Sequence, residues 1–83
     1  MADHLDSNLL ELLEKEIRSG EEKYGPFKSK SEAYSILVHE MLDLHWYLKR
    51  EEMGQGNANN EWVQVAAVAL RSLTQFTKWS QER

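Results

Sequence analysis

Between residues 33 and 48, apolar side chains occupy nearly every position around the axis of the helix that this stretch is expected to form. They are Ala33, Tyr34, Ile36, Leu37, Val38, Met41, Leu42, Leu44, Trp46, Tyr47 and Leu48. A helix that is apolar nearly all round is covered on more than one side. A chain of 83 residues has a marginal core of its own. We therefore expect the second cover to come from another subunit.

Four ionisable side chains interrupt this apolar stretch: His39, Glu40, Asp43 and His45. Burying a carboxylate without a partner costs several kcal/mol. Each acid in this stretch should therefore have a partner, bind a metal or lie on an exposed face. His45 is expected on the surface or at a subunit interface.

The periodicity of apolar residues predicts three helices and no strand, at about residues 6–24, 30–52 and 60–77. In the first helix, Leu5, Leu9, Leu12, Leu13 and Ile17 recur at three- and four-residue steps. Its charged residues should form a solvated face with the i, i+4 pairs Glu11–Lys15 and Glu14–Arg18. We predict an all-α chain with a single domain over residues 1–83. Short loops favour antiparallel neighbours in an oligomeric bundle.

The helix boundaries follow from local signals. Gly20 should loosen the last turn of the first helix, and Gly25-Pro26 should end it. The run Ser29-Lys30-Ser31-Glu32 is a capping box for the second helix. The segment "GQGNANN", residues 54–60, is expected to be flexible and to have no apolar anchor. Asn59 or Asn60 should cap the third helix.

Composition excludes several classes of function. The chain has no cysteine, so disulfides and thiolate metal sites are excluded. Its net charge of −4, with Lys and Arg scattered, argues against binding a DNA or RNA polymer, which requires a basic surface. No apolar run approaches the length of a transmembrane helix, and the first residues lack the features of a signal peptide. We expect a cytoplasmic protein without a membrane contact.

Two sets of polar residues lie within the apolar helices at the same spacing. Glu40 and Asp43 are three residues apart on the second helix, and Glu61 and Gln64 repeat this spacing on the third. Residues at i and i+3 share a helix face, so the two sets can face each other across an antiparallel pair. Oxygen ligands arranged in this way suit Mg²⁺, which commonly bridges to substrate phosphates. The pattern therefore predicts a magnesium site.

The chain resembles the MazG-like all-α nucleotide pyrophosphohydrolases. The resemblance lies in "YGPFKSKSEAY", which leads into the E-x-x-D of Glu40 and Asp43, and in "EWVQVAAVALR", which begins at Glu61. It covers roughly residues 22–76. The family signature is E-x-x-E on one helix and E-x-x-D on the next.

This resemblance implies hydrolysis of a nucleoside triphosphate to a monophosphate and pyrophosphate, with Mg²⁺ as the cofactor. It also implies a homo-oligomer, a dimer or a tetramer. Glu40, Asp43 and Glu61 would be the catalytic metal ligands, with Gln64 as a weaker oxygen donor. Gln64 stands where the signature has Asp, and His39 stands where relatives often carry a second acid. A second metal ion is therefore not expected, and the activity can be weak, altered or lost.

Other interpretations of the same residues stay open. Glu61 in a first helical turn is favoured by the helix dipole alone, and His39 and Asp43 can simply hydrogen-bond each other. Lys28 and Lys30 are either solvated or contact the phosphates of the nucleotide. The aromatic side chains Trp46, Tyr47 and Trp62 are core or subunit contacts, or one of them stacks on a base. The rival function is a non-catalytic helical interaction module that retains the same bundle.

Overall fold

The computed structural model describes residues 7–77 as three helices. They are α1 (Ser7–Tyr24), α2 (Lys30–Glu52) and α3 (Asn59–Phe76), and residues 7–77 contain no strand. The all-α prediction is confirmed, and the predicted bounds differ from these by at most one residue. Asp6, the predicted first residue of the first helix, and both ends of the predicted domain, residues 1–6 and 78–83, lie outside the described residues.

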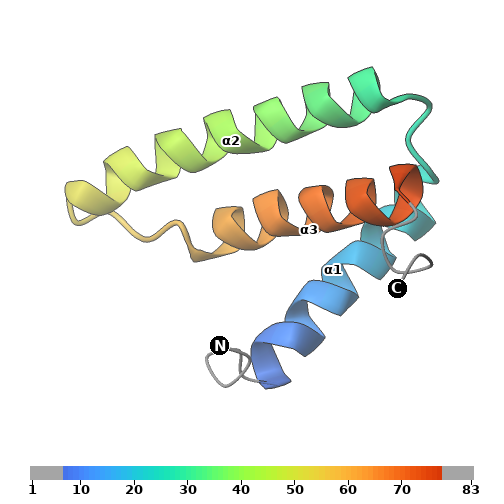
Figure 1. Ribbon diagram of the computed structural model, residues 1–83. Helices are drawn as coiled ribbons and strands as arrows, with labels where there is room; N and C mark the ends of the chain where they lie inside the picture. The colour runs from blue at the N-terminus through green and yellow to red at the C-terminus, as the bar shows by residue number, and fades with distance from the viewer. Residues whose placement is uncertain (1–6, 78–83) are drawn as a thin grey trace.

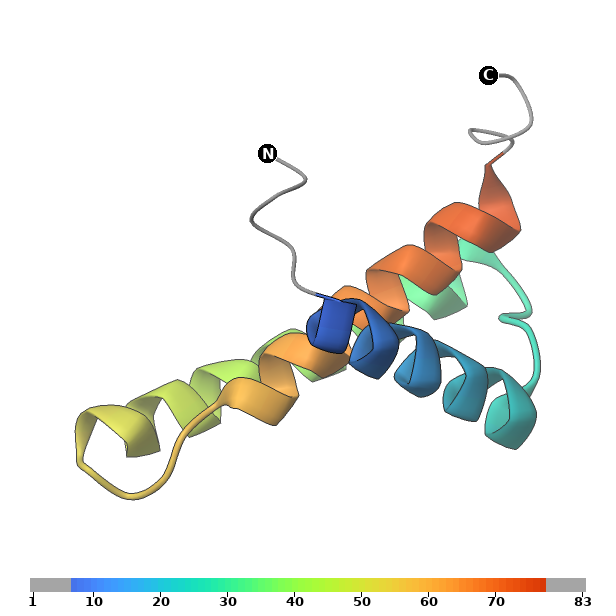
Figure 2. The same cartoon turned by 90° about the horizontal axis from the view of Figure 1, so that it is seen from below.

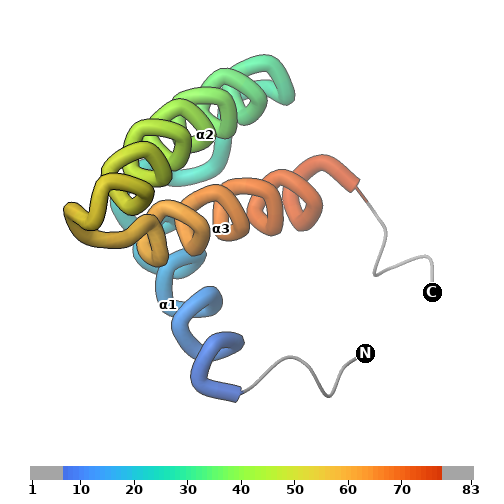
Figure 3. The backbone as a smooth tube through the Cα atoms, turned by 90° about the vertical axis from the view of Figure 1, so that its left-hand side faces the viewer, coloured from blue at the N-terminus to red at the C-terminus, as the bar shows by residue number. Residues whose placement is uncertain are grey.

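Helix α3 occupies the middle of the arrangement and packs against both other helices. Figure 1 shows α2 and α3 running antiparallel, as predicted, with α1 crossing at an angle. Figures 1 and 3 agree that the N-terminal end of α1 lies away from the other two helices. The view in Figure 2 shows how the short connection after α1 returns the chain to the beginning of α2. The three helices thus converge near the end of α1.

The end of α1 is set by Gly25. Its φ of 70° lies in the left-handed region that glycine adopts without a steric cost. Its N–H donates to the carbonyl of Glu21 at 2.9 Å, which satisfies one of the free carbonyls at the end of the helix. The predicted stop at Gly25-Pro26 is confirmed. The helix runs without interruption through Gly20, so the expected loosening there is not observed.

The beginning of α2 is capped by Ser29. Its Oγ accepts a hydrogen bond from the Glu32 N–H at 3.0 Å, as predicted. The reciprocal bond differs by one residue, because Glu32 Oε1 accepts from the N–H of Lys28 at 2.9 Å and not from that of Ser29. The carboxylate therefore ties down the approaching loop as well as the first turn.

The Ser29→Ala variant is expected to lose about 1 kcal/mol of unfolding free energy, the usual effect of removing a side-chain N-cap. Ser31 lies in the first turn of the same helix and is exposed, so Ser31→Ala is a matched control. Urea unfolding followed by circular dichroism compares the two variants. Equal midpoints would contradict the capping role of Ser29.

The connection between α2 and α3 differs from its prediction. Ala58 is fully buried, and its N–H donates to Glu51 Oε2 at 3.2 Å. The expectation that this segment has no apolar anchor is therefore wrong. The capping residue of α3 is Ala58, without a side-chain hydrogen bond, so neither of the two predicted asparagines is the cap. Asn57 instead accepts from the N–H of Asn59 at 3.0 Å.

The core of one chain is small. Phe27, Ala33 and Val68 are buried together, and Ile36, Leu37 and Phe76 pack against them. The rings of Phe27 and Phe76 stack with centroids 6.3 Å apart. Gln75 holds Phe27 in place, because it accepts from its N–H at 2.9 Å and donates to its carbonyl at 2.6 Å. No large side chain among residues 7–77 is fully buried.

Many large apolar side chains are exposed instead. They are Leu9, Leu10, Leu12, Tyr24, Tyr34, Met41, Leu42, Trp46, Tyr47, Met53, Trp62, Leu70 and Leu73. Only Ala33 and Leu44 of α2 are buried, so one chain covers a narrow strip of that apolar helix. Trp46 and Trp62 are 60% and 55% exposed. They are therefore not core residues of one chain, and their contact with another subunit or with a base stays a prediction.

Candidate functional site

The predicted acids of α2 and α3 interact at Glu40. This residue is half-buried on α2, and Glu61 lies in the first turn of α3. Burial raises the pKa of Glu40 above its ordinary value of 4.5, the negative charges of Asp43 and Glu61 raise it further, and His39 lowers it. The antiparallel packing thus brings three of the four predicted ligands within electrostatic reach of one another.

The three acids have no neutralising cation in the described part of the chain. Within residues 7–77, neither Glu40, Asp43 nor Glu61 forms an ion pair with Lys, Arg or His. The alternative in which His39 hydrogen-bonds Asp43 is likewise not observed in this part of the chain. Their charges are therefore available to an external cation.

The donor chemistry fits Mg²⁺, although a complete cage is not formed in advance. The described residues contain no group of three His, Asp or Glu side chains arranged to hold a metal ion. Mg²⁺ retains several waters and is usually bound through one or two carboxylates together with substrate phosphates. Glu40 with one neighbouring acid meets that requirement, and the four-ligand magnesium site stays a prediction.

Gln64 is bound by a residue that the sequence did not identify as part of the site. Its Nε2 donates to the carboxylate of Glu16 on α1. We expected the charges of α1 to form a solvated face, and Glu16 is instead half-buried. One signal was present in the sequence, because Glu16 follows Leu12 and Leu13 by four and three residues and so shares their apolar side of the helix.

A cavity of about 290 Å³ lies where the three helices converge. It is lined by Glu16, Gly20, Tyr24, Gly25, Pro26, Phe27, Glu32, Ile36, Glu40, Gln64, Ala67, Val68 and Arg71. Glu40 and Gln64, two of the predicted site residues, lie on its wall, whereas Asp43 and Glu61 do not. The candidate site is therefore this cavity, with Glu40 joining it to the other two acids.

The two lysines that were considered for phosphate contact lie elsewhere. Lys28 and Lys30 are both exposed, and neither lines the cavity that contains Glu40. Lys30 borders a separate groove of about 420 Å³ between α2 and α3, lined by Lys30, Ala33, Tyr34, Leu37, Ala69, Ser72, Leu73, Phe76 and Thr77. We call this the α2–α3 groove. The structure does not bring either lysine to the candidate site.

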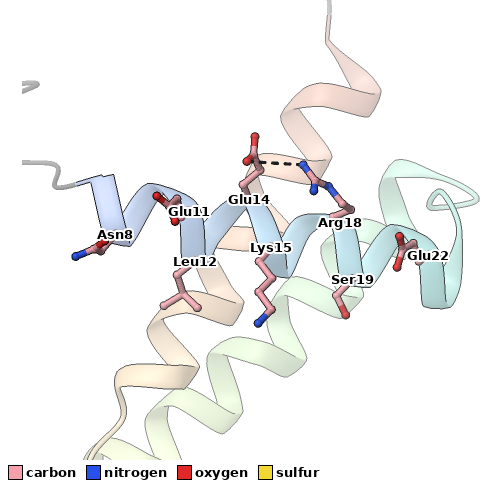
Figure 4. Close-up of a pocket in the computed structure, with 8 residues that line it drawn as sticks. All are labelled: Asn8, Glu11, Leu12, Glu14, Lys15, Arg18, Ser19 and Glu22. Atoms are coloured by element: carbon pink, nitrogen blue, oxygen red, sulfur yellow. Dashed lines mark ion pairs between the residues drawn. The ribbon is translucent and has the colours of Figure 1, made fainter.

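A second hollow runs along α1. All eight residues that line it belong to α1, as Figure 4 shows. The side chains of Leu12, Lys15 and Ser19 point to one side, whereas Glu14 and Arg18 point to the other and form the predicted ion pair at 3.7 Å. Because both partners are exposed, this pair has little effect on stability. No second element closes around the hollow.

Comparison of the chain with protein-family models, with curated proteins and with solved structures gives no match. The resemblance to the MazG-like enzymes therefore depends on the quoted residues alone. No helix within residues 7–77 combines the length and the apolar character that crossing a bilayer requires.

Proposed function

We propose that this protein is a Mg²⁺-dependent nucleoside triphosphate pyrophosphohydrolase of the MazG-like kind. The observation that supports this proposal is the meeting at Glu40 of carboxylates from two helices, none of them paired with a cation in the described part of the chain. Mutual repulsion of this kind is unfavourable in the metal-free protein and is relieved by a divalent cation. A purely structural cluster would be expected to contain a compensating Lys or Arg.

In this proposal, each side chain has a separate role. Glu40, Asp43 and Glu61 hold the metal from two helices, and Mg²⁺, when bound, supplies positive charge to the phosphates and to an attacking water. Glu16 holds Gln64 through its amide N–H group. The Oε1 atom of Gln64 does not take part in this bond and would be a neutral oxygen donor toward the metal. Gln64 thus acts as a neutral donor where the family signature has a charge.

The rival proposal is a non-catalytic interaction module with the same bundle. Two observations favour it: the described residues form no complete metal-binding group, and large apolar side chains are exposed on all three helices. Calorimetry separates the two functions. Heat on adding a non-hydrolysable nucleotide only when Mg²⁺ is present supports the enzyme, and no heat in either condition supports the module.

Pyrophosphate release tests the proposed activity directly. We expect at least one of a panel of ribo- and deoxyribonucleoside triphosphates to yield a monophosphate and pyrophosphate in the presence of Mg²⁺, and none in excess chelator. Enzyme-coupled detection of pyrophosphate, with chromatography of the nucleotide, measures both products. Release of inorganic phosphate and a diphosphate would place the cleavage at a different bond and contradict the proposal.

The same proposal includes a homo-oligomer, a dimer or a tetramer. The α2–α3 groove presents apolar side chains of two helices, among them Tyr34 at 68% and Leu73 at 52% exposure. The groove contains no residue of α1, so its apolar wall is open to another molecule. A second copy can supply the apolar surface that completes a four-helix arrangement. A two-fold dimer also pairs the same groove with itself, which needs no other partner.

A further inference from the structure

Arg71 is the one residue among 7–77 that is both charged and buried, with 8% of its surface exposed. A buried guanidinium is usually neutralised by a carboxylate. In this part of the chain Arg71 forms no ion pair, and its Nη2 donates a hydrogen bond to the carbonyl of Gly25 at 3.0 Å. Its charge is thus left without a carboxylate partner within the described residues.

Most of the N–H groups of Arg71 have no hydrogen-bond acceptor within residues 7–77. A guanidinium has five N–H donors, and one acceptor takes only one of them. Within residues 7–77, no buried side-chain nitrogen or oxygen lacks a hydrogen-bond partner. The nitrogens of Arg71 that do not bond Gly25 are therefore not completely enclosed, and Arg71 lines the same cavity as Glu16, Glu40 and Gln64.

The position of the guanidinium is fixed by the residues around it. Its Cζ lies 4.3 Å from the centroid of the Phe27 ring, an arrangement that favours a cation over the ring face. A Cβ on Gly20 would lie 2.9 Å from Nη1 of Arg71, so the guanidinium lies directly against the backbone of α1. Together with Gly25 as acceptor, Phe27 and Gly20 hold the planar group in one orientation.

Helix geometry places Arg71 at one end of the cavity and Gln64 at the other. They are seven residues apart on α3, which puts both on the same side of the helix and about 10 Å apart along its axis. Glu16 and Glu40 belong to the Gln64 end, because Glu16 accepts from Gln64 and Glu40 is coupled to Glu61, three residues before Gln64. Glu16 and Glu40 thus make the Gln64 end of the cavity acidic. Glu32, the third carboxylate of the wall, is eight residues before Glu40 on α2, and it accepts from the N–H of Lys28, next to Phe27.

We propose that Arg71 binds the phosphate chain of a Mg²⁺-bound nucleotide whose metal is held at the acidic end of this cavity. This inference rests on the proposed function. Three carboxylates and one guanidinium line the cavity, so a free anion is repelled and a metal-bound phosphate is accepted. The planar fork of Arg matches two phosphate oxygens at once, which the point charge of Lys does not.

Calorimetric titration with pyrophosphate, in excess Mg²⁺ and in chelator, tests this assignment on the full chain. The parent should bind pyrophosphate only with Mg²⁺. Arg71→Lys, which keeps the charge and loses the fork, should weaken that binding by about tenfold to a hundredfold. Arg18→Lys is the matched control, because Arg18 is exposed and, within residues 7–77, pairs with Glu14 alone. The affinity of this variant should equal that of the parent.

A structural role for Arg71 makes a different prediction. It would lower the unfolding midpoint of Arg71→Lys and leave its affinity unchanged, and that result overturns the assignment. If Arg71→Lys does not fold, Gly20→Ala replaces it. Its Cβ displaces the guanidinium while alanine favours the helix, so the affinity should fall with helix content retained. Unchanged affinity of Gly20→Ala would also overturn the assignment.

Two further outcomes separate this subsite from the proposed enzyme. If the parent binds Mg²⁺-pyrophosphate through Arg71 but cleaves no triphosphate, the phosphate-binding role of Arg71 is supported and the proposed enzymatic activity is contradicted. If the parent cleaves a triphosphate and Arg71→Lys binds and cleaves it equally well, the proposed activity is supported and the phosphate-binding role of Arg71 is contradicted. Weaker binding of a non-hydrolysable triphosphate without weaker binding of pyrophosphate would assign Arg71 to the nucleoside and contradict a phosphate contact.

Discussion

Replacing Glu40 by Gln is expected to reduce triphosphate cleavage by at least about a hundredfold while leaving the metal-free protein as stable as the parent or more stable. Even residues that only orient a metal ligand affect affinity or activity about 10- to 100-fold, and Glu40 is proposed as a ligand itself. The stability should not fall, because Gln keeps the shape of the side chain and removes the repulsion from Asp43 and Glu61.

The pH dependence of stability follows from the raised pKa of Glu40. A carboxyl whose pKa is higher in the folded state binds protons more readily when folded, so protonation stabilises the fold. The stabilisation by this protonation is complete below the ordinary pKa of the carboxyl, and it is lost as the pH rises through the raised pKa of the folded state. The stability advantage of Glu40→Gln over the parent should therefore be largest near pH 7 and shrink as the pH falls toward the ordinary value of 4.5.

Thermal unfolding of both proteins in chelator and in Mg²⁺ measures these effects. Mg²⁺ should raise the midpoint of the parent and raise that of Glu40→Gln less. Glu52→Gln, at an exposed position of the same helix, is the control and should behave as the parent in both conditions. If Glu40 instead belongs to a buried ion pair, its replacement strands the partner and costs about 3–5 kcal/mol. A loss of that size in chelator would remove Glu40 from the metal site.

The helices could be predicted from sequence because their ends are set by local chemistry. Ser29 and Gly25 act through backbone groups a few residues away, and such signals need no knowledge of the tertiary fold. The electrostatic interaction of Glu40 with Glu61 across two helices is expected from equal i, i+3 spacings on antiparallel neighbours. Local patterns therefore predict the three helices of residues 7–77 and the approach of the acids of α2 and α3.

The remaining features depend on how α1 crosses α3, which no local pattern specifies. Glu16 meets Gln64, and Arg71 meets Gly20 and Gly25, across more than 45 residues of chain. The role of Gly20 becomes clear only when the crossing of α1 and α3 is known, because the absence of a side chain at Gly20 leaves room for the guanidinium of Arg71. The Gly and Asn residues around Ala58 are turn formers and indicate a flexible segment. The bond from the N–H of Ala58 to the side chain of Glu51, seven residues earlier, is not visible in that pattern.

Replacing Leu73 by Glu should dissociate the oligomer and, with it, lower the unfolding midpoint. Leu73 is 52% exposed in one chain and lines the α2–α3 groove, where the proposed second copy would cover it. A two-fold interface contains each substitution twice. Each buried, unpaired carboxylate costs several kcal/mol, so the dissociation constant should rise by at least about a hundredfold.

Multi-angle light scattering at micromolar concentration measures the result. The parent should have at least twice the chain mass of 9.7 kDa, and Leu73→Glu should approach the mass of one chain. Leu10→Glu is the matched control, because Leu10 is 48% exposed on α1 and does not line the groove, so its mass should equal that of the parent. A monomeric parent would contradict the oligomer itself. If the parent is oligomeric and Leu73→Glu has the same mass, the interface lies on another face. Leu42 and Trp46, exposed apolar side chains of α2 outside the groove, would then be the next residues to substitute.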